Sequence, residues 1–256
     1  MIILLRGHIR TSFNNNKLYS FIKHLCITYK DVEIYIHTWD IIQSNISWRS
    51  IEKKEISITN NIIHKYFKEY SKYIKNIIID DDNTIKLNGN TNGIIAGSRC
   101  PLIGWKNYWY GQYKIIDFIN NNIIDKNKFI LNLRFDIFYN PHGFSERDII
   151  MFINKYYNTI LSENKFLYDK FFLGCDNCFI GNVTTMYKLI HHFHHNLDNI
   201  LKKFNKIVHQ EGLVMIENSI LFNSENKINI NSVVNYGNRF DKLKTFRFIN
   251  HSMKKI

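Results

Sequence analysis

Residues 129–140, FILNLRFDIFYN, decide how this chain folds. The apolar beginning of the stretch, 129–133, predicts a buried strand. This strand runs directly into Arg134 and Asp136, and a charged pair after a core strand is best placed at the carboxyl edge of a sheet, outside which ligands of open α/β sheets bind. Arg134 could face a phosphate or carboxylate there with its planar fork of donors, and Asp136 could ligate Mg²⁺ or Mn²⁺. The alternative is a partly exposed structural ion pair.

Length and composition favour one globular domain. The chain has 256 residues, of which 45% are hydrophobic, enough for a sizeable core. Its four cysteines do not form a disulfide scaffold at this length and favour a reducing compartment. No apolar run approaches the length of a membrane span, and the first residues lack the basic region of a signal peptide, so we expect a cytoplasmic protein without a transmembrane segment. These features do not determine the oligomeric state.

Strand and helix patterns alternate along the chain. Short apolar or alternating runs predict strands at 2–5, 32–36, 77–79, 129–133 and 228–234, and short strand-like pieces at 171–173 and 179–180. Helical spacing of apolar residues predicts helices at 18–26, 62–74, 105–122, 149–156, 186–204 and 213–222, with Ser145 as a cap before the fourth. This alternation predicts an α/β fold, a mixed central sheet with helices on both faces.

Polar and charged side chains follow the early strands as well. Gly7 permits a tight turn or the close approach of a ligand to the backbone, and Arg6 and Arg10 place two cations beside it. The second strand ends in a polar and aromatic cluster, 37–40 (HTWD). The three aspartates 80–82 suggest a metal site, but the Asn and Gly residues that follow favour a solvated turn.

One cysteine and histidine pattern resembles a zinc finger by spacing alone. Cys175 and Cys178 are followed by His191 and His195 in the spacing C-x2-C-x12-H-x3-H. On a helix, however, these histidines lie on the side opposite the apolar stripe around Phe193, whereas a finger turns its histidines inward. We therefore expect reduced cysteines in a strand turn and a solvated, histidine-rich helix face.

Six short motifs occur in one order along nearly the whole chain: LLRGHIRTSF, VEIYIHTWD, NYWYGQYKIIDFI, LNLRFDIFYN, FLGCDNCFIGN and IENSILFN. Their order resembles glycosyltransferases of bacterial surface-polysaccharide clusters and of giant DNA viruses, whose pattern reads approximately G-x-I-R-T, D-V-x-I-H-T-W, R-x-D, D-x-x-x-x-G and E-x-x-L. The resemblance implies a single Rossmann-like GT-A domain over 1–256, with a nucleotide-binding half (1–125) and a metal and acceptor half (126–256). It also implies a nucleotide-sugar donor and a glycan acceptor, as in polysaccharide biosynthesis.

The resemblance also implies roles for individual residues. The donor-binding residues would be Arg6, Gly7, Arg10, Thr11, Trp39, Asp40 and Arg134. Trp39 and Asp40 would hold the base and ribose, although Trp39 as a core residue fits the pattern equally well. Arg134 to Asp136 would stand at the Asp-x-Asp metal motif of GT-A enzymes, with arginine in place of the first aspartate. Asp136 alone would then hold Mn²⁺ or Mg²⁺, or transfer would be independent of metal.

Transfer with inversion, the stereochemistry that we expect, requires a carboxylate to accept the proton of the acceptor hydroxyl. Asp176 is the first candidate because it lies in a glycine-flanked turn, and Glu217 is the second. As alternatives, Asp176 would cap its own turn and Glu217 would be a solvated helix residue. Cations at the departing diphosphate would stabilise its charge in the transition state.

The net charge of +12 permits a different class of function, a basic protein that binds nucleic acid without catalysis. Lysine and arginine are spread along most of the chain, and the densest basic stretch is 239–255. Because this dispersal is typical of a solvated surface, no nucleic-acid partner is expected. A catalytically silent scaffold is a third possibility, since a fold by itself does not prove activity.

Overall fold

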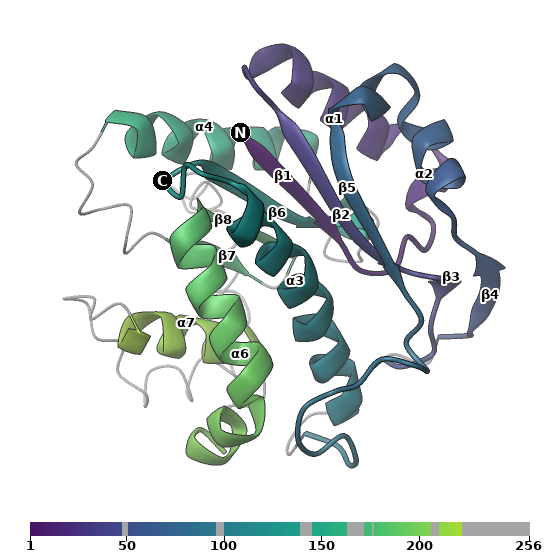
Figure 1. Ribbon diagram of the computed structural model, residues 1–256, viewed down its shortest axis with the longest axis vertical. Helices are drawn as coiled ribbons and strands as arrows, with labels where there is room; N and C mark the ends of the chain where they lie inside the picture. Colours follow the sequence, from purple (N-terminus) through teal and green to yellow (C-terminus); the bar gives the residue numbers. More distant parts are fainter. Residues whose placement is uncertain are drawn as a thin grey trace, which may run out of the picture.

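The computed structural model describes residues 1–47, 51–95, 100–138, 145–162, 172–175, 177–205 and 210–221. Within them lies a six-stranded sheet covered by helices (Figure 1). The strand order is β5 (Ile74–Asp80), β2 (Glu33–Trp39), β1 (Ile2–Arg6), β6 (Phe129–Arg134), β8 (Cys178–Asn182) and β7 (Phe172–Cys175). The first four strands are parallel, and β8 runs antiparallel to both its neighbours. The predicted α/β fold with a mixed sheet is confirmed, and it is compatible with a Rossmann-like arrangement.

The helices form two layers, one on each face of the sheet. One layer consists of α1 (Lys17–Thr28), α2 (Asn60–Phe67) and α4 (Glu146–Ser162), and the other of α3 (Leu102–Asn122), α6 (Val183–Lys203) and α7 (Gln210–Leu221). Among the helices that the structure describes, none is both long and apolar enough to cross a membrane.

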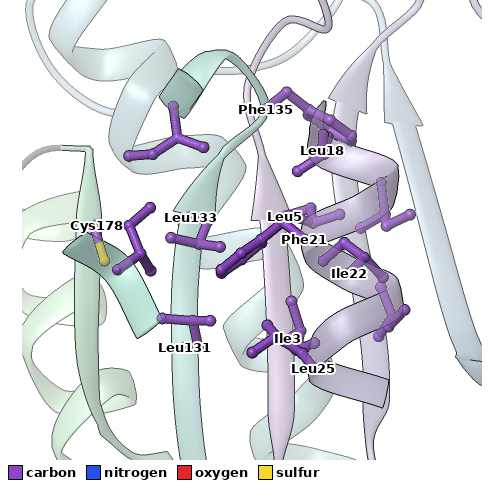
Figure 2. Packing of buried hydrophobic residues seen from close by; sticks show 14 of the residues in the cluster. Ile3, Leu5, Leu18, Phe21, Ile22, Leu25, Leu131, Leu133, Phe135 and Cys178 are labelled. Carbon is purple, nitrogen blue, oxygen red and sulfur yellow. The ribbon is translucent and has the colours of Figure 1, made fainter. Parts of the chain in front are cut away.

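Strand β1 supplies both hydrophobic cores because successive side chains of a strand point to opposite faces. Ile3 and Leu5 belong to the core under α1, whereas Ile2 and Leu4 belong to the core under α3 and α6. Figure 2 shows Phe21 of α1 packed over the first of these faces. Each such side chain, when fully buried, contributes about 1.5–3 kcal/mol to the free energy of folding.

Capping side chains define where two of the helices begin. The Ser145 hydroxyl donates to the Asp148 carboxylate at 2.7 Å, and the Asp148 amide donates back to the Ser145 oxygen at 3.1 Å. This confirms the predicted cap of α4. Helix α6 has a reciprocal cap, in which the Asn182 oxygen accepts from the Thr185 amide at 2.9 Å. Such caps satisfy amide donors that have no partner within the helix.

The helix predicted at 62–74 is wrong in its second half. Helix α2 ends at Phe67, a 3-10 helix η2 (Lys68–Tyr73) follows, and β5 starts at Ile74. Lys68 has φ 50°, a left-handed conformation that an α-helix cannot continue through. Apolar residues continue at helical spacing past the end of α2, because those in η2 and at the start of β5 also pack against the core.

Two short strands, β3 (Ile41–Gln43) and β4 (Lys54–Ser57), pair with each other outside the main sheet, and the sequence patterns did not predict them. Only a few residues form each strand, too few for a periodic signal. The strand predicted at 228–234 lies outside the described residues.

The histidine-rich face of α6 is only partly solvated, which corrects our expectation. Phe193 is buried and stacks on Trp109 of α3, with ring centroids 4.2 Å apart. His194 is also buried and stacks on Tyr113, at 4.3 Å. The expectation failed because α3 packs against more than the apolar stripe of α6.

Helix α3 lies so close to the sheet that a glycine is required at one contact. A Cβ atom on Gly111 would lie 2.6 Å from the ring of His37 on β2, and that ring is fully buried. We predict that Gly111→Ala lowers the free energy of unfolding by about 1–3 kcal/mol, because the backbone or the ring has to move.

Gly104, on the same helix, provides the matched control. A Cβ atom there would meet Ile46 at 3.4 Å, an ordinary contact. Gly104→Ala should be neutral or stabilising by up to about 1 kcal/mol, because alanine is the better helix former. Chemical denaturation of both variants measures the difference, and equal stabilities would contradict the close packing of α3 on His37.

Candidate functional site

The polar strand ends that the sequence predicted as a site meet at one edge of the sheet. In the strand register Arg6 lies beside His37 on one side and Arg134 on the other. Trp39 pairs in the same way with Asp80 at the end of β5. The carboxyl ends of β5, β2, β1 and β6 therefore form one continuous polar border, which we call the carboxyl edge.

Asp136 follows β6 at one end of the carboxyl edge and is bound by two arginines. Arg134 Nε donates to Asp136 Oδ1 and Arg134 Nη2 donates to Oδ2, both at 2.8 Å. Arg10 Nη1 donates to Oδ2 at 2.6 Å. The Asp136 side chain is 7% exposed, whereas those of Arg10 and Arg134 are 22% and 21% exposed. Burial raises the pKa of Asp136, but the two guanidinium groups outweigh it and lower that pKa to about 2.

The turn after β1 brings Arg10 to Asp136 through two unusual backbone conformations. Gly7 has φ 88°, and its amide donates to the His37 carbonyl at 3.2 Å. Arg10 has φ 53°, which is uncommon for a residue with a side chain. The Arg10 amide donates to the Ile42 carbonyl at 2.9 Å, so backbone and side chain are both held. Thr11 follows as an exposed residue at the start of η1 (Ser12–Asn14).

Arg6, the third predicted cation of the donor site, is buried in a polar network and is not exposed at the carboxyl edge. Its Nε donates to Asn132 Oδ1 at 2.7 Å, and Asn132 Nδ2 donates to Gln112 Oε1 at 3.0 Å. The guanidinium lies 4.8 Å from the ring centre of Tyr108. Asn132 and Gln112 were not predicted from the sequence, although a polar residue inside an apolar strand, such as Asn132, was the available signal.

On the other half of the edge, His37 and Asp80 form a partly buried hydrogen bond. His37 Nε2 lies 3.2 Å from Asp80 Oδ2, and the ring is fully enclosed. Burial lowers the pKa of His37 and outweighs the nearby carboxylate, so the neutral imidazole donates. That hydrogen bond lowers the pKa of Asp80, while burial and Asp80 raise the pKa of Tyr110 to about 12. The HTWD motif contained His37, but its partner came from another strand.

Trp39 and Asp40, predicted to hold the base and ribose, both have buried side-chain atoms. Trp39 is 3% exposed and stacks on His8 and Tyr110, so its ring serves the core. Asp40 Oδ1 is enclosed without a hydrogen-bond partner among the described residues. Burial raises the pKa of Asp40, and the neighbouring aspartates raise it further. Asp82 is buried, which contradicts a fully solvated turn at 80–82.

Of the two candidate bases, Glu217 belongs to the described residues and Asp176 does not. Asp176 lies outside the described residues, but the Asn177 carbonyl accepts from the Arg134 amide at 3.1 Å, next to the carboxyl edge. Glu217 on α7 is buried, which contradicts a solvated helix residue. Its carboxylate binds His192 Nε2 at 2.8 Å and Lys203 Nζ at 3.4 Å. These contacts give Glu217 a role in joining α7 to α6.

The described residues do not fit a divalent cation at Asp136. Both oxygens of its carboxylate accept hydrogen bonds from guanidinium groups, so a cation would have to displace Arg134 or Arg10. Over the described part of the chain, no three His, Cys, Asp or Glu side chains are grouped so that they could hold a metal. The Mn²⁺ or Mg²⁺ expected from the resemblance therefore stays a prediction that this geometry does not favour.

The buried, neutral His37 predicts a specific dependence of stability on pH. A folded-state pKa below the unfolded value of about 6.5 makes stability complete above that value and progressively lower as pH falls toward the folded pKa. Unfolding then takes up one proton, so the free energy of unfolding falls by up to about 1.4 kcal/mol per pH unit.

His37→Gln keeps a donor toward Asp80 and removes the titrating group, so we predict a shallower slope between about pH 6 and pH 5. This window lies above most carboxylate titrations. His8 and His194 also have lowered pKa values, so the difference between the two slopes, and not the wild-type slope itself, reports on His37. Urea denaturation at both pH values gives the slopes. Equal slopes in wild type and variant would show that His37 is charged in the folded protein.

Comparison with protein-family models, with curated proteins and with solved structures finds no match for this chain. A functional conclusion therefore depends on the geometry of the carboxyl edge and on the ordered motifs. The edge has a cationic part on β1 and β6, around Asp136, and an acidic part on β2 and β5, around Asp80.

Proposed function

We propose that this chain is a glycosyltransferase that moves a sugar from a nucleotide-sugar donor to a hydroxyl of a glycan acceptor. The observation that carries the proposal is the pair of partly exposed arginines, Arg10 and Arg134, which a buried carboxylate holds at the carboxyl edge. Ligands of open α/β sheets bind at this edge, and guanidinium groups match the oxygens of a diphosphate.

The order of the six motifs supports a GT-A assignment within the observed α/β class. The RTSF, HTWD and RFD segments, far apart in the sequence, contribute to one edge of a mostly parallel sheet. Arg10, His37 and Arg134 come from these segments. A single domain would thus hold the donor at the ends of its parallel strands.

The chemistry requires stabilisation of the leaving group and removal of one proton. The acceptor oxygen forms a bond to the anomeric carbon while the bond from that carbon to the diphosphate oxygen breaks. Arg10 and Arg134 would stabilise the charge that develops on the diphosphate. Asp176 would accept the proton from the acceptor hydroxyl. Because the acceptor oxygen attacks opposite the departing diphosphate in a single displacement, the configuration at the anomeric carbon would invert. Asn177, the neighbour of Asp176, lies beside Arg134, consistent with this order of groups.

We predict that one nucleoside diphosphate and its sugar conjugate raise the melting temperature of the protein, because a ligand of the folded state alone stabilises it. Arg134→Gln should weaken this binding by about tenfold or more, the effect of losing a charge-assisted hydrogen bond.

Lys75→Gln is the charge-matched control, since Lys75 is exposed at the opposite, amino end of β5. Thermal shift and calorimetry measure both variants. Oligonucleotide binding with a steep salt dependence and no nucleotide response would instead identify a nucleic-acid-binding protein.

The two candidate bases are separated by a second prediction. Asp176→Asn should lower kcat by about 10²–10⁴-fold and leave donor affinity nearly unchanged, because a general base acts in the chemical step. Glu217→Gln should instead lower the free energy of unfolding by about 1–3 kcal/mol, because buried Glu217 binds both His192 and Lys203 of α6.

Turnover, donor affinity and melting temperature are measured together for both variants. A large loss of kcat in Glu217→Gln with unchanged stability would transfer the role of base to Glu217. A product of retained configuration would contradict the inverting mechanism for both.

A further inference from the structure

We infer that Asp136 is a positioning residue that orients Arg10 and Arg134, and that these two arginines bind the diphosphate of the donor without a divalent cation. This inference deepens the proposed function and rests on it for the identity of the diphosphate. It assigns the residue at the expected metal position to a different role.

The first supporting observation is the hydrogen-bond pattern of Asp136. Arg134 binds it in a bidentate manner and Arg10 binds Oδ2 as well, so both oxygens accept from guanidinium groups. A cation ligand needs lone pairs directed at the metal, whereas both carboxylate oxygens of this buried side chain are directed at guanidinium groups. A metal at Asp136 would have to break bidentate, charge-assisted hydrogen bonds and bring three positive groups together.

The second supporting observation is the charge and exposure of the Arg10, Arg134 and Asp136 side chains. Two guanidinium groups and one carboxylate leave one positive charge at this position. The carboxylate is buried beneath, and the arginines are partly exposed above it. A buried carboxylate beneath partly exposed arginines is typical of a group that orients a binding surface. A guanidinium group that is already held in place loses little conformational freedom when it binds a ligand.

The third supporting observation is the backbone conformation of Arg10. Its φ of 53° is unfavourable for a residue with a side chain, and a hydrogen bond to the Ile42 carbonyl holds it there. Strained conformations of this kind persist where surrounding contacts determine them, and they cluster at functional sites. Here the strain places the Arg10 guanidinium 2.6 Å from the carboxylate that also holds Arg134.

The experiment measures binding of inorganic pyrophosphate, and of a panel of ribonucleoside diphosphates, by calorimetry in EDTA and then with Mn²⁺. We expect binding in EDTA that Mn²⁺ does not tighten. Asp136→Asn should weaken binding in EDTA by about tenfold or more, although it removes a negative charge, because the arginines lose their orientation. Asp31→Asn is the matched control, an exposed aspartate in the loop before β2, and should bind as wild type does.

Arg10→Lys tests the same inference if Asp136→Asn does not fold. It keeps the positive charge and loses the fork, so binding in EDTA should again weaken by about tenfold. Unchanged affinity in this variant, or equal or tighter binding in folded Asp136→Asn, would overturn the positioning role.

The outcomes separate this inference from the proposed function. Diphosphate binding that requires Mn²⁺ and is lost in Asp136→Asn would overturn the inference and leave glycosyl transfer standing. Binding in EDTA with no response to any nucleotide sugar would support the arginine site and contradict the proposed function. Failure of every diphosphate to bind in either condition would overturn both.

Discussion

The structure depends on how the chain accommodates a carboxylate that is almost completely buried at the edge of its central sheet. A buried charge is costly unless opposite charges and hydrogen bonds surround it. Asp136 meets this condition through Arg134, two residues away, and Arg10, which comes from the turn after β1. The left-handed backbone at Arg10 and the glycine turn at Gly7 follow from the need to bring that second arginine across from β1.

Helix α3 supports the rest of the edge, because it contacts residues of β1, β2 and β6 in or near their carboxyl-terminal parts. Tyr108 lies over Arg6, Tyr110 lies beside Trp39, Gly111 allows the approach of His37, and Gln112 binds Asn132. Higher on the same helix, Lys106 binds Asp198 of α6 at 2.7 Å and the Asn88 carbonyl at 2.7 Å. One helix thus joins the sheet, the loop after β5 and helix α6 of its own layer.

The edge is electrically asymmetric, and this asymmetry gives the proposed site a direction. Arg10 and Arg134 lie on the β1 and β6 side, whereas Asp40 and Asp80 follow β2 and β5. An anionic group is attracted to the first half and repelled by the second, and hydroxyl groups suit the second half as hydrogen-bond donors. A nucleotide sugar, with an anionic diphosphate and hydroxyl-bearing ribose and sugar, matches such an edge in chemical character.

The sequence by itself determined the fold class, most helix and strand positions, and the places where polar residues follow strands. These are local properties, set by periodicity, caps and turn residues, so Ser145 and the end of β6 were predicted correctly. Only the tertiary structure decided which polar groups are partners. The Arg10 contact with Asp136 joins two segments that follow different strands, and the His37 contact with Asp80 joins two strands. The tertiary structure also decided that Arg6, Trp39 and Glu217 are buried. Burial depends on which distant segments pack against a residue, and no local sequence pattern contains that information.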